Sequence, residues 1–276
     1  MEIIPATDVR SYARMGSQEL RSAFLLSDLF QPGKMRLRYW ETDRAVIGGA
    51  MPTRAKLTLK TEPELAATHF CERRELGVIN IGEEGTVEVD GVRFTLGNLD
   101  CLYIGRGAQR VTFASKSAAK PACFYLLSYP AHTHYPTTLV RHDDIAGTAI
   151  GSGETSNGRV IYKFIHAGGI KSCQLVMGLT LLKSGSIWNT MPPHTHTRRS
   201  EVYCYFDLKE TAAVFHFLGR PDETRHLVVR NRDIALSPPW SIHSGAGTDN
   251  YGFIWGMGGE NQDFADMDPA PLATLR

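Results

Sequence analysis

The sequence predicts an all-β protein that consists of two similar β-barrels and one short N-terminal helix. From residue 36 onward, short runs rich in Val, Ile, Tyr and Phe alternate with Gly, Pro, Asn and Asp, which is typical of antiparallel sandwiches and barrels. Residues 86–89 and 92–96 flank Asp90-Gly91, whose residue types suit the positive φ angles of a two-residue hairpin turn. The chain has 276 residues, whereas a typical domain has roughly 100–150, so two domains or one duplicated fold are expected.

One segment near the N-terminus has a helical pattern. Between residues 17 and 30, Leu20, Phe24 and neighbouring apolar residues recur at three-to-four spacing, and Pro32-Gly33 ends the pattern. We expect this helix to act as a packing arm.

A diffuse internal repeat indicates the duplication. Residues 73–75 and 198–201 each open an apolar strand, and each half then continues through further strands to a Gly- or Pro-rich corner, at residues 105–107 and 238–240.

The repeat divides the chain into two expected domains. We assign residues 1–135 to an N-terminal barrel and residues 136–276 to a C-terminal barrel. Turn formers concentrate between residues 130 and 158, which indicates the linker.

The composition excludes several classes of partner. The 30 basic and 29 acidic side chains are mixed along the chain, so no extended positive field is available for nucleic acid or an anionic membrane. The N-terminus lacks signal-peptide features, and no apolar run approaches the roughly 18 residues of a membrane span, which favours a cytoplasmic location. The five cysteines form no CxxC pair and are interpreted as reduced, buried thiols.

The C-terminal half contains a pattern that predicts a mononuclear metal site. His194 and His196 are two residues apart, so on a strand both imidazoles point to the same face. Glu201 follows at an odd offset, which requires a bulge or tight bend near residues 197–200. His243 lies in a Pro-rich corner that would hold its ring in a fixed orientation. Three histidines and one glutamate suit Zn, Fe, Mn, Ni or Co.

Similar residues elsewhere are weaker candidates. A lone histidine is more often a surface or hydrogen-bonded residue than a ligand, and His132-Thr133-His134 has no acid at ligand spacing. A structural role is therefore expected for that tripeptide, with a position at a substrate pocket as the alternative. In the first repeat, His69 and Cys71 precede Glu75, but Arg106 or its glycine neighbours occupy the place of a fourth ligand. We expect the N-terminal barrel to be metal-free.

Catalytic and substrate-binding candidates are more ambiguous. Strand alternation places Tyr203 and Tyr205 on the face of Glu201, where they either line the cavity or fill the barrel. Glu260 is the first carboxylate after the apolar strand at residues 253–255 and a glycine turn, so it acts as a proton carrier or as a cap. Five cations are candidates for binding a carboxylate, with a surface position as the alternative: Lys163, Arg199, Arg225, Arg198 and Arg159.

The metal motif resembles the paired motifs of the cupin superfamily, whose fold is a double-stranded β-helix barrel. Gly185 lies nine residues before His194, which departs from the usual cupin spacing, so this match alone identifies no function.

A closer resemblance covers nearly the whole chain. Five strings resemble the 5-dehydro-4-deoxy-D-glucuronate isomerase family, the 4-deoxy-L-threo-5-hexosulose-uronate ketol-isomerases: residues 72–82 (ERRELGVINIG), 130–132 (PAH), 188–192 (WNTMP), 223–226 (ETRH) and 253–257 (FIWGM). Thr197 departs from the pattern, since an acidic residue is expected directly after the second histidine. Thr197 is not one of the expected ligands, so this difference would affect the surroundings of the metal site and not the reaction itself.

The resemblance implies two cupin-like double-stranded β-helix barrels and a zinc-dependent aldose–ketose isomerase of pectin breakdown, usually a homohexamer. One Zn²⁺ per chain would be held by His194, His196, Glu201 and His243. The implied reaction converts 5-dehydro-4-deoxy-D-glucuronate, a small sugar acid, to 3-deoxy-D-glycero-2,5-hexodiulosonate. A divalent ion with three neutral imidazoles and one carboxylate keeps net positive charge, which suits stabilisation of an enediolate.

Two alternatives stay open. The same ligands holding Fe suit a cupin dioxygenase, which oxygen dependence would reveal. A metal-stabilised barrel that binds sugar acids without converting them would also need these residues.

Overall fold

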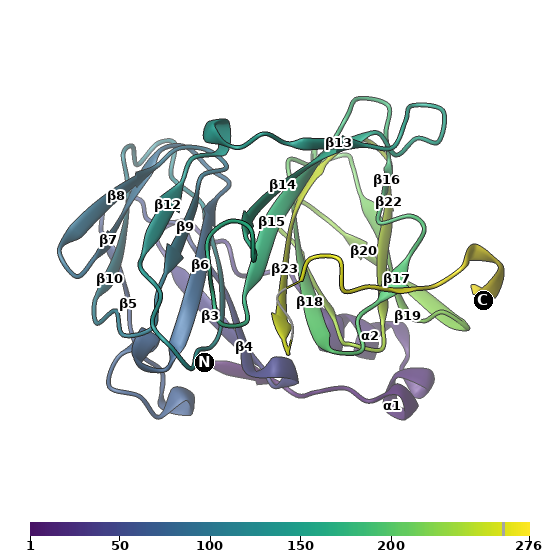
Figure 1. The fold of residues 1–276 in the computed structure, drawn as a ribbon, viewed down its shortest axis with the longest axis horizontal. Helices are drawn as coiled ribbons and strands as arrows, with labels where there is room; N and C mark the ends of the chain where they lie inside the picture. Colours follow the sequence, from purple (N-terminus) through teal and green to yellow (C-terminus); the bar gives the residue numbers. More distant parts are fainter. Residues whose placement is uncertain (261–262) are drawn as a thin grey trace. The chain divides into compact units, whose positions relative to one another are not determined.

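The computed structural model describes residues 1–260 and 263–276, and it consists mostly of β-strands, which confirms the all-β expectation. The chain forms two compact units (Figure 1). Unit 1 contains residues 1–4, 28–146 and 164–176, and unit 2 contains residues 5–27, 147–163 and 177–276. Each unit combines segments that lie far apart in the sequence: residues 5–27 belong to unit 2, and residues 164–176 belong to unit 1. The single boundary after residue 135 that the repeat suggests does not separate these segments.

The first pair of sheets has the strand orders β1-β3-β4-β11-β6-β9-β12 and β5-β10-β7-β8. The strands are β1 (Glu2–Ile4), β3 (Met35–Trp40), β4 (Ala45–Ala50), β5 (Leu57–Leu59), β6 (Arg74–Asn80), β7 (Gly85–Val89), β8 (Val92–Leu96), β9 (Cys101–Ile104), β10 (Val111–Ser115), β11 (Phe124–Pro130) and β12 (Thr138–Val140). The predicted hairpin is confirmed, because β7 pairs with β8 through Val89 and Val92, and Asp90 and Gly91 have φ angles of 48° and 86°.

The second pair of sheets repeats this plan, with the orders β13-β14-β15-β23-β18-β21-β2 and β16-β22-β19-β20, and with β17 paired to β24. The strands are β2 (Leu25–Leu26), β13 (Thr148–Ile150), β14 (Arg159–Ile165), β15 (Val176–Leu182), β16 (Trp188–Asn189), β17 (His194–Thr195), β18 (Arg199–Phe206), β19 (Val214–Arg220), β20 (Glu223–Val229), β21 (Ile234–Ser237), β22 (Ile242–Gly247), β23 (Gly252–Gly259) and β24 (Asp268–Pro269).

Helical segments are short. They are α1 (Val9–Arg14), α2 (Ser17–Phe24) and the 3-10 turns η1 (Thr42–Arg44), η2 (Pro63–Leu65), η3 (Phe70–Glu72), η4 (His142–Asp144) and η5 (Leu272–Thr274). The helix expected over residues 17–30 ends at Phe24, because Leu25 and Leu26 extend and pair with β21. Helix α1 was not expected from the sequence. Its signal is Asp8, whose side chain caps the helix by accepting the N–H groups of Arg10 and Ser11.

Tyr12 anchors these helices within unit 2. Its hydroxyl donates to the main-chain oxygens of Leu218 and Glu223, at 3.2 and 3.0 Å. Its ring centroid lies 5.2 Å from that of Trp240, in the Pro-rich corner that precedes His243. Residues 5–27 therefore belong to the barrel that carries the predicted ligands, although they begin the chain.

Glu75 on β6 is buried and is held by hydrogen bonds within unit 1. Its two carboxylate oxygens accept the N–H groups of residues 173–175 at 2.7 to 2.8 Å, and one of them accepts the Tyr103 hydroxyl at 2.8 Å. Burial, and then the charge of Glu75, raise the pKa of Tyr103, which keeps the phenol protonated as a donor. The carboxylate is thus satisfied by protein donors alone.

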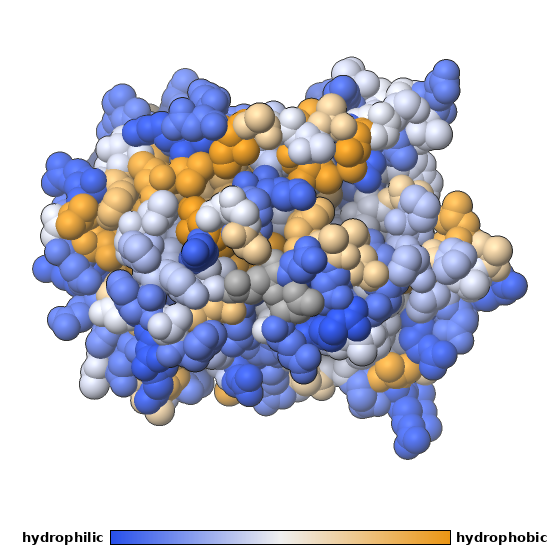
Figure 2. All heavy atoms as spheres, viewed as in Figure 1, coloured by the Kyte–Doolittle hydropathy of each residue, from blue (hydrophilic) through white to orange (hydrophobic). Residues whose placement is uncertain are grey.

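Few large apolar side chains of the described residues are exposed, namely Ile3, Val92, Phe215, Met267 and Leu272. In Figure 2, hydrophilic residues surround smaller hydrophobic areas on the face that is shown. No helix within residues 1–260 or 263–276 is both long and apolar enough to cross a membrane.

We expect Glu75→Ala to lower the free energy of unfolding by about 3 kcal/mol or more, because buried N–H donors lose their acceptor. Urea denaturation followed by tryptophan fluorescence measures this loss. Glu88→Gln is the control, since Glu88 has only long surface ion pairs with Lys56 and Arg93, at 3.7 and 3.9 Å, and should change stability by less than about 0.5 kcal/mol. A Glu75→Ala protein as stable as the control would contradict this role.

Candidate metal centre and pocket

Four side chains from different strands of unit 2 meet at one point. His194 lies on β17, His196 directly follows that strand, Glu201 lies on β18 and His243 lies on β22. One possible ligand atom from each lies within 4.8 Å of the other three. The four residues predicted from sequence are therefore brought together.

Local structure explains how Glu201 reaches the histidines despite its odd offset. Residues 197 and 198 form a turn, closed by a bond from the Arg199 N–H to the His196 oxygen at 3.2 Å. Strand β18 then runs between β21 and β23, with Glu201 paired to Ser237 and Met257. The turn provides the bend that the spacing requires, and the central strand fixes the carboxylate.

The rings of His196 and His243 are oriented by contacts of their Nδ1 atoms with protein oxygens. His196 Nδ1 lies 2.5 Å from the Asp266 main-chain oxygen, so Nδ1 carries the proton and Nε2 presents a lone pair to the cluster. His243 Nδ1 lies 3.3 Å from the hydroxyl of Ser237, and β22 pairs His243 with Leu218 of β19. Burial, and then the neighbouring His243, lower the pKa of His194 to about 2, which keeps this imidazole neutral.

Glu201 supplies the negative charge of the cluster. Burial alone would raise the pKa of its carboxyl group, but the electrostatic effect of His243 and the 2.9 Å contacts with Nε2 of His196 and of His243 hold it well below the ordinary value. Glu201 is therefore ionised at neutral pH.

The distances suit a single metal ion. The Nε2 atom of His194 lies 3.1 Å from that of His196 and 3.0 Å from that of His243, and Glu201 Oε2 lies 2.9 Å from the latter two Nε2 atoms. Ligands about 2.1 Å from one ion lie about 3.0 Å apart at right angles and about 3.4 Å apart in a tetrahedron. Nitrogen lone pairs and the Glu201 carboxylate oxygen point at one another and repel. A cation placed between them would remove that repulsion. The donor set fits a divalent transition metal.

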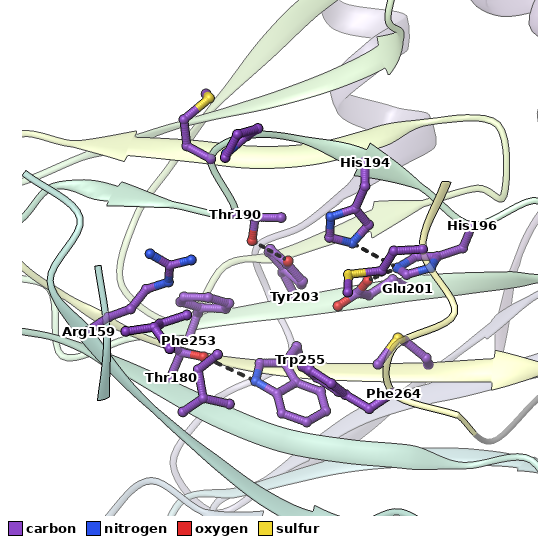
Figure 3. Close-up of a pocket in the computed structure, with 16 residues that line it drawn as sticks. Arg159, Thr180, Thr190, His194, His196, Glu201, Tyr203, Phe253, Trp255 and Phe264 are labelled. Atoms are coloured by element: carbon purple, nitrogen blue, oxygen red, sulfur yellow. Dashed lines mark hydrogen bonds and ion pairs between the residues drawn. The ribbon is translucent and has the colours of Figure 1, made fainter. Parts of the chain in front are cut away.

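A pocket of about 250 Å³ lies beside the cluster and includes His194, His196 and Glu201 in its wall (Figure 3). Phe253, Trp255 and Met257, which alternate on β23, supply an apolar wall. Polar side chains in the wall are already paired: Thr190 Oγ1 lies 2.8 Å from the Tyr203 hydroxyl, and Trp255 Nε1 donates to Thr180 at 3.1 Å. The sequence analysis did not assign this apolar wall, although the period-two pattern of β23 is its signal.

The three catalytic candidates lie in different surroundings. Tyr203 lines the pocket, next to Glu201. Tyr205 is buried outside the pocket lining, and its hydroxyl lies 2.7 Å from Nδ1 of His216. Glu260 is exposed, does not line the pocket, and its main-chain N–H donates to the Arg198 oxygen.

Of the five candidate cations, Arg199, Arg225 and Lys163 lie outside the pocket lining. Arg199 donates to the main-chain oxygens of residues 263, 264 and 266, and Arg225 donates to those of residues 13 and 15. Lys163 Nζ lies 4.1 Å from the centre of the Phe264 ring. Arg198 pairs with Asp266 and Asp268. Arg159, the remaining candidate, lines the pocket.

The second His-x-His tripeptide lies in unit 1. His134 Nδ1 lies 2.7 Å from the Arg106 main-chain oxygen, and the Arg106 side chain donates to the His132 oxygen at 2.8 Å. These contacts join the tripeptide to the corner that carries Arg106.

Comparison with known proteins identifies the family. The model of the KduI/IolB family matches residues 25–271. Two relatives named 4-deoxy-L-threo-5-hexosulose-uronate ketol-isomerase, from Lachnoclostridium phytofermentans and Halalkalibacterium halodurans, are each 50% identical over 276 residues and 100% of both chains. An IolB-like protein from Salmonella typhimurium has a similar fold, with a TM-score of 0.70 at 14% identity, covering 87% of this chain and 94% of that chain. The relatives confirm the resemblance seen in the sequence, and the chain belongs to the KduI/IolB family.

Proposed function

We propose that this protein is a zinc-dependent ketol-isomerase that converts 5-dehydro-4-deoxy-D-glucuronate to 3-deoxy-D-glycero-2,5-hexodiulosonate. The observation that carries the proposal is the cluster of His194, His196, Glu201 and His243 at a small pocket, in a chain 50% identical to ketol-isomerases over its full length. Further parts of the proposal, supported by the resemblance alone, are pectin or uronate breakdown as the process, a homohexamer and a cytoplasmic location.

The proposed reaction moves one proton from C2 to C1 and a second proton from the C2 hydroxyl to the C1 oxygen, and it leaves the overall oxidation state of the substrate unchanged. The C1 aldehyde becomes an alcohol, and the C2 hydroxyl becomes a ketone. His194, His196, Glu201 and His243 would hold a divalent ion, which would act as a Lewis acid for the negative charge that develops on the substrate. The apolar wall formed by Phe253 and Trp255 limits water near the reacting carbons, which strengthens these electrostatic interactions.

Tyr203 is the proposed proton-exchanging group of the chain. Its ring centroid lies 5.4 Å from that of His243, and its hydroxyl faces Thr190 in the pocket wall. Burial, and then the charge of Glu201, raise the pKa of Tyr203 well above its ordinary value, so the phenol holds its proton at neutral pH. A protonated phenol can donate to a substrate oxygen as negative charge develops there.

We expect about one divalent ion per chain in the purified protein and a roughly tenfold or larger loss of bound metal in His243→Ala. Elemental analysis after dialysis measures the ion. His226→Ala is the control, because His226 is exposed on β20 and contacts the Phe215 ring. A second stoichiometric ion, or full metal retention in His243→Ala, would contradict the site.

The zinc-loaded protein should isomerise the keto-aldehyde uronate in the absence of oxygen, because the proposed reaction is redox-neutral. An anaerobic assay that follows both sugars by NMR tests this expectation. Product that forms only with iron and air would favour a dioxygenase. Binding of the sugar without conversion would favour a non-catalytic barrel.

We expect Tyr203→Phe to lower kcat roughly a hundredfold at unchanged metal content, because the phenol proton is removed and the ring is kept. Glu260→Gln tests the other carrier expected from the sequence. The exposed position of Glu260 favours a change of only a few-fold. The reverse result, with a large loss only in Glu260→Gln, would exclude Tyr203 and restore Glu260.

A further inference from the structure

Arg159 lies at the end of the pocket opposite the ligand cluster. Figure 3 shows its guanidinium on one side of Tyr203 and Phe253, with His194, His196 and Glu201 on the other. Among the residues that the structure describes, it is the only Lys or Arg in the pocket lining. The pocket therefore has charged groups at its two ends and an apolar wall between them.

The charge of Arg159 has no acidic partner among the residues that the structure describes. Within the described ranges, Arg159 forms no ion pair with an Asp or Glu, and its Nη1 donates to the Asn157 main-chain oxygen at 2.9 Å. A guanidinium has five N–H donors, so several stay available to a ligand. Its side chain is part-buried, and burial lowers the pKa of Arg159 because water solvates the cation less well there. An anion at this position would offset that loss of solvation.

The other cations near the pocket differ from Arg159 in this respect. Arg199 has three main-chain acceptors, and Arg198 has two carboxylate partners. Lys163 lies four residues further along β14, on the face of Arg159, but its ammonium rests on the Phe264 ring. Arg159 is therefore the cation that is both in the pocket wall and unneutralised.

We propose that Arg159 binds the carboxylate of a sugar-acid substrate and thereby directs the opposite, carbonyl end of the molecule to the His194, His196 and Glu201 cluster. This inference rests on the proposed function. Guanidinium pairs with a carboxylate through two parallel N–H bonds, which fix direction as well as position. Because the central wall offers only paired polar groups, the two ends of the pocket determine the orientation of the substrate.

The test compares the keto-aldehyde acid with its methyl ester, which keeps the reacting carbons and lacks the negative charge. We expect Arg159→Met to lower kcat/KM for the acid roughly a hundredfold, mainly by raising KM. The value of kcat/KM for the ester should change by less than about threefold. Arg159→Lys should recover part of the loss, because it restores the charge without the two-bond geometry. Metal content should stay at the wild-type value.

Two variants serve as controls for loss of one positive charge. Lys183→Met removes an exposed cation from the same unit and should leave both substrates unaffected. Lys163→Met removes the neighbouring cation of β14. If Arg159→Met lowered acid and ester equally, or if Lys163→Met alone reproduced the selective loss, the assignment of Arg159 would be overturned.

A binding measurement separates this inference from the proposed reaction. Calorimetry with D-gluconate and uncharged D-glucitol requires no turnover. We expect the zinc-loaded wild type to bind gluconate more tightly than glucitol, and Arg159→Met to remove the difference. Gluconate binding that is absent or insensitive to Arg159→Met overturns the carboxylate site. Conversely, a wild type that binds gluconate through Arg159 but converts no keto-aldehyde contradicts only the proposed reaction.

Discussion

The burial of an ionised Glu201 among three imidazoles is the interaction on which the rest of the candidate site depends. A buried carboxylate is unfavourable unless cations or hydrogen-bond donors compensate it. Strand β18 fixes Glu201 between β21 and β23. Strand β22 and the residue after β17 bring Nε2 of His243 and of His196 to 2.9 Å from the Glu201 carboxylate. The barrel thus holds four possible metal-ligand atoms together, which limits the rearrangement that binding of an ion would require.

The first barrel satisfies a comparable carboxylate in another way. Glu75 lies near the start of β6 much as Glu201 lies near the start of β18, yet three main-chain N–H groups and the Tyr103 hydroxyl donate to its oxygens. Those main-chain groups come from residues 173–175, far along the chain from β6. A buried carboxylate at this position is therefore not enough to predict a metal site. The groups around its oxygens decide, because hydrogen-bond donors occupy those of Glu75 whereas imidazole nitrogens surround Glu201.

The parts that could be predicted from sequence are those encoded by local pattern. Short runs rich in Val, Ile, Tyr and Phe indicated the strands, Asp90-Gly91 indicated the hairpin, and the His194-x-His196 pattern with Glu201 and the His243 corner indicated a shared site. The exchange of residues 5–27 into unit 2 could not be predicted, because it depends on where the Tyr12 hydroxyl finds its main-chain acceptors. Arg159, Arg199 and Arg225 are likewise equivalent in sequence. Only the fold shows which guanidinium is already bonded to main-chain oxygens and which one faces the pocket.

The charges of the site connect metal loading to substrate binding. Histidines that bind a metal do so as neutral imidazoles, so the four residues alone carry the single negative charge of Glu201. A divalent ion reverses the sign to a net positive charge, and Arg159 adds a second positive charge in the same pocket. An anionic sugar acid would therefore be repelled by the cluster without the ion and attracted with it. Because coupling between two ligands is reciprocal, the bound acid must in turn raise the affinity for the ion. The same four residues that would activate the substrate would thus also restrict its binding to the metal-loaded protein.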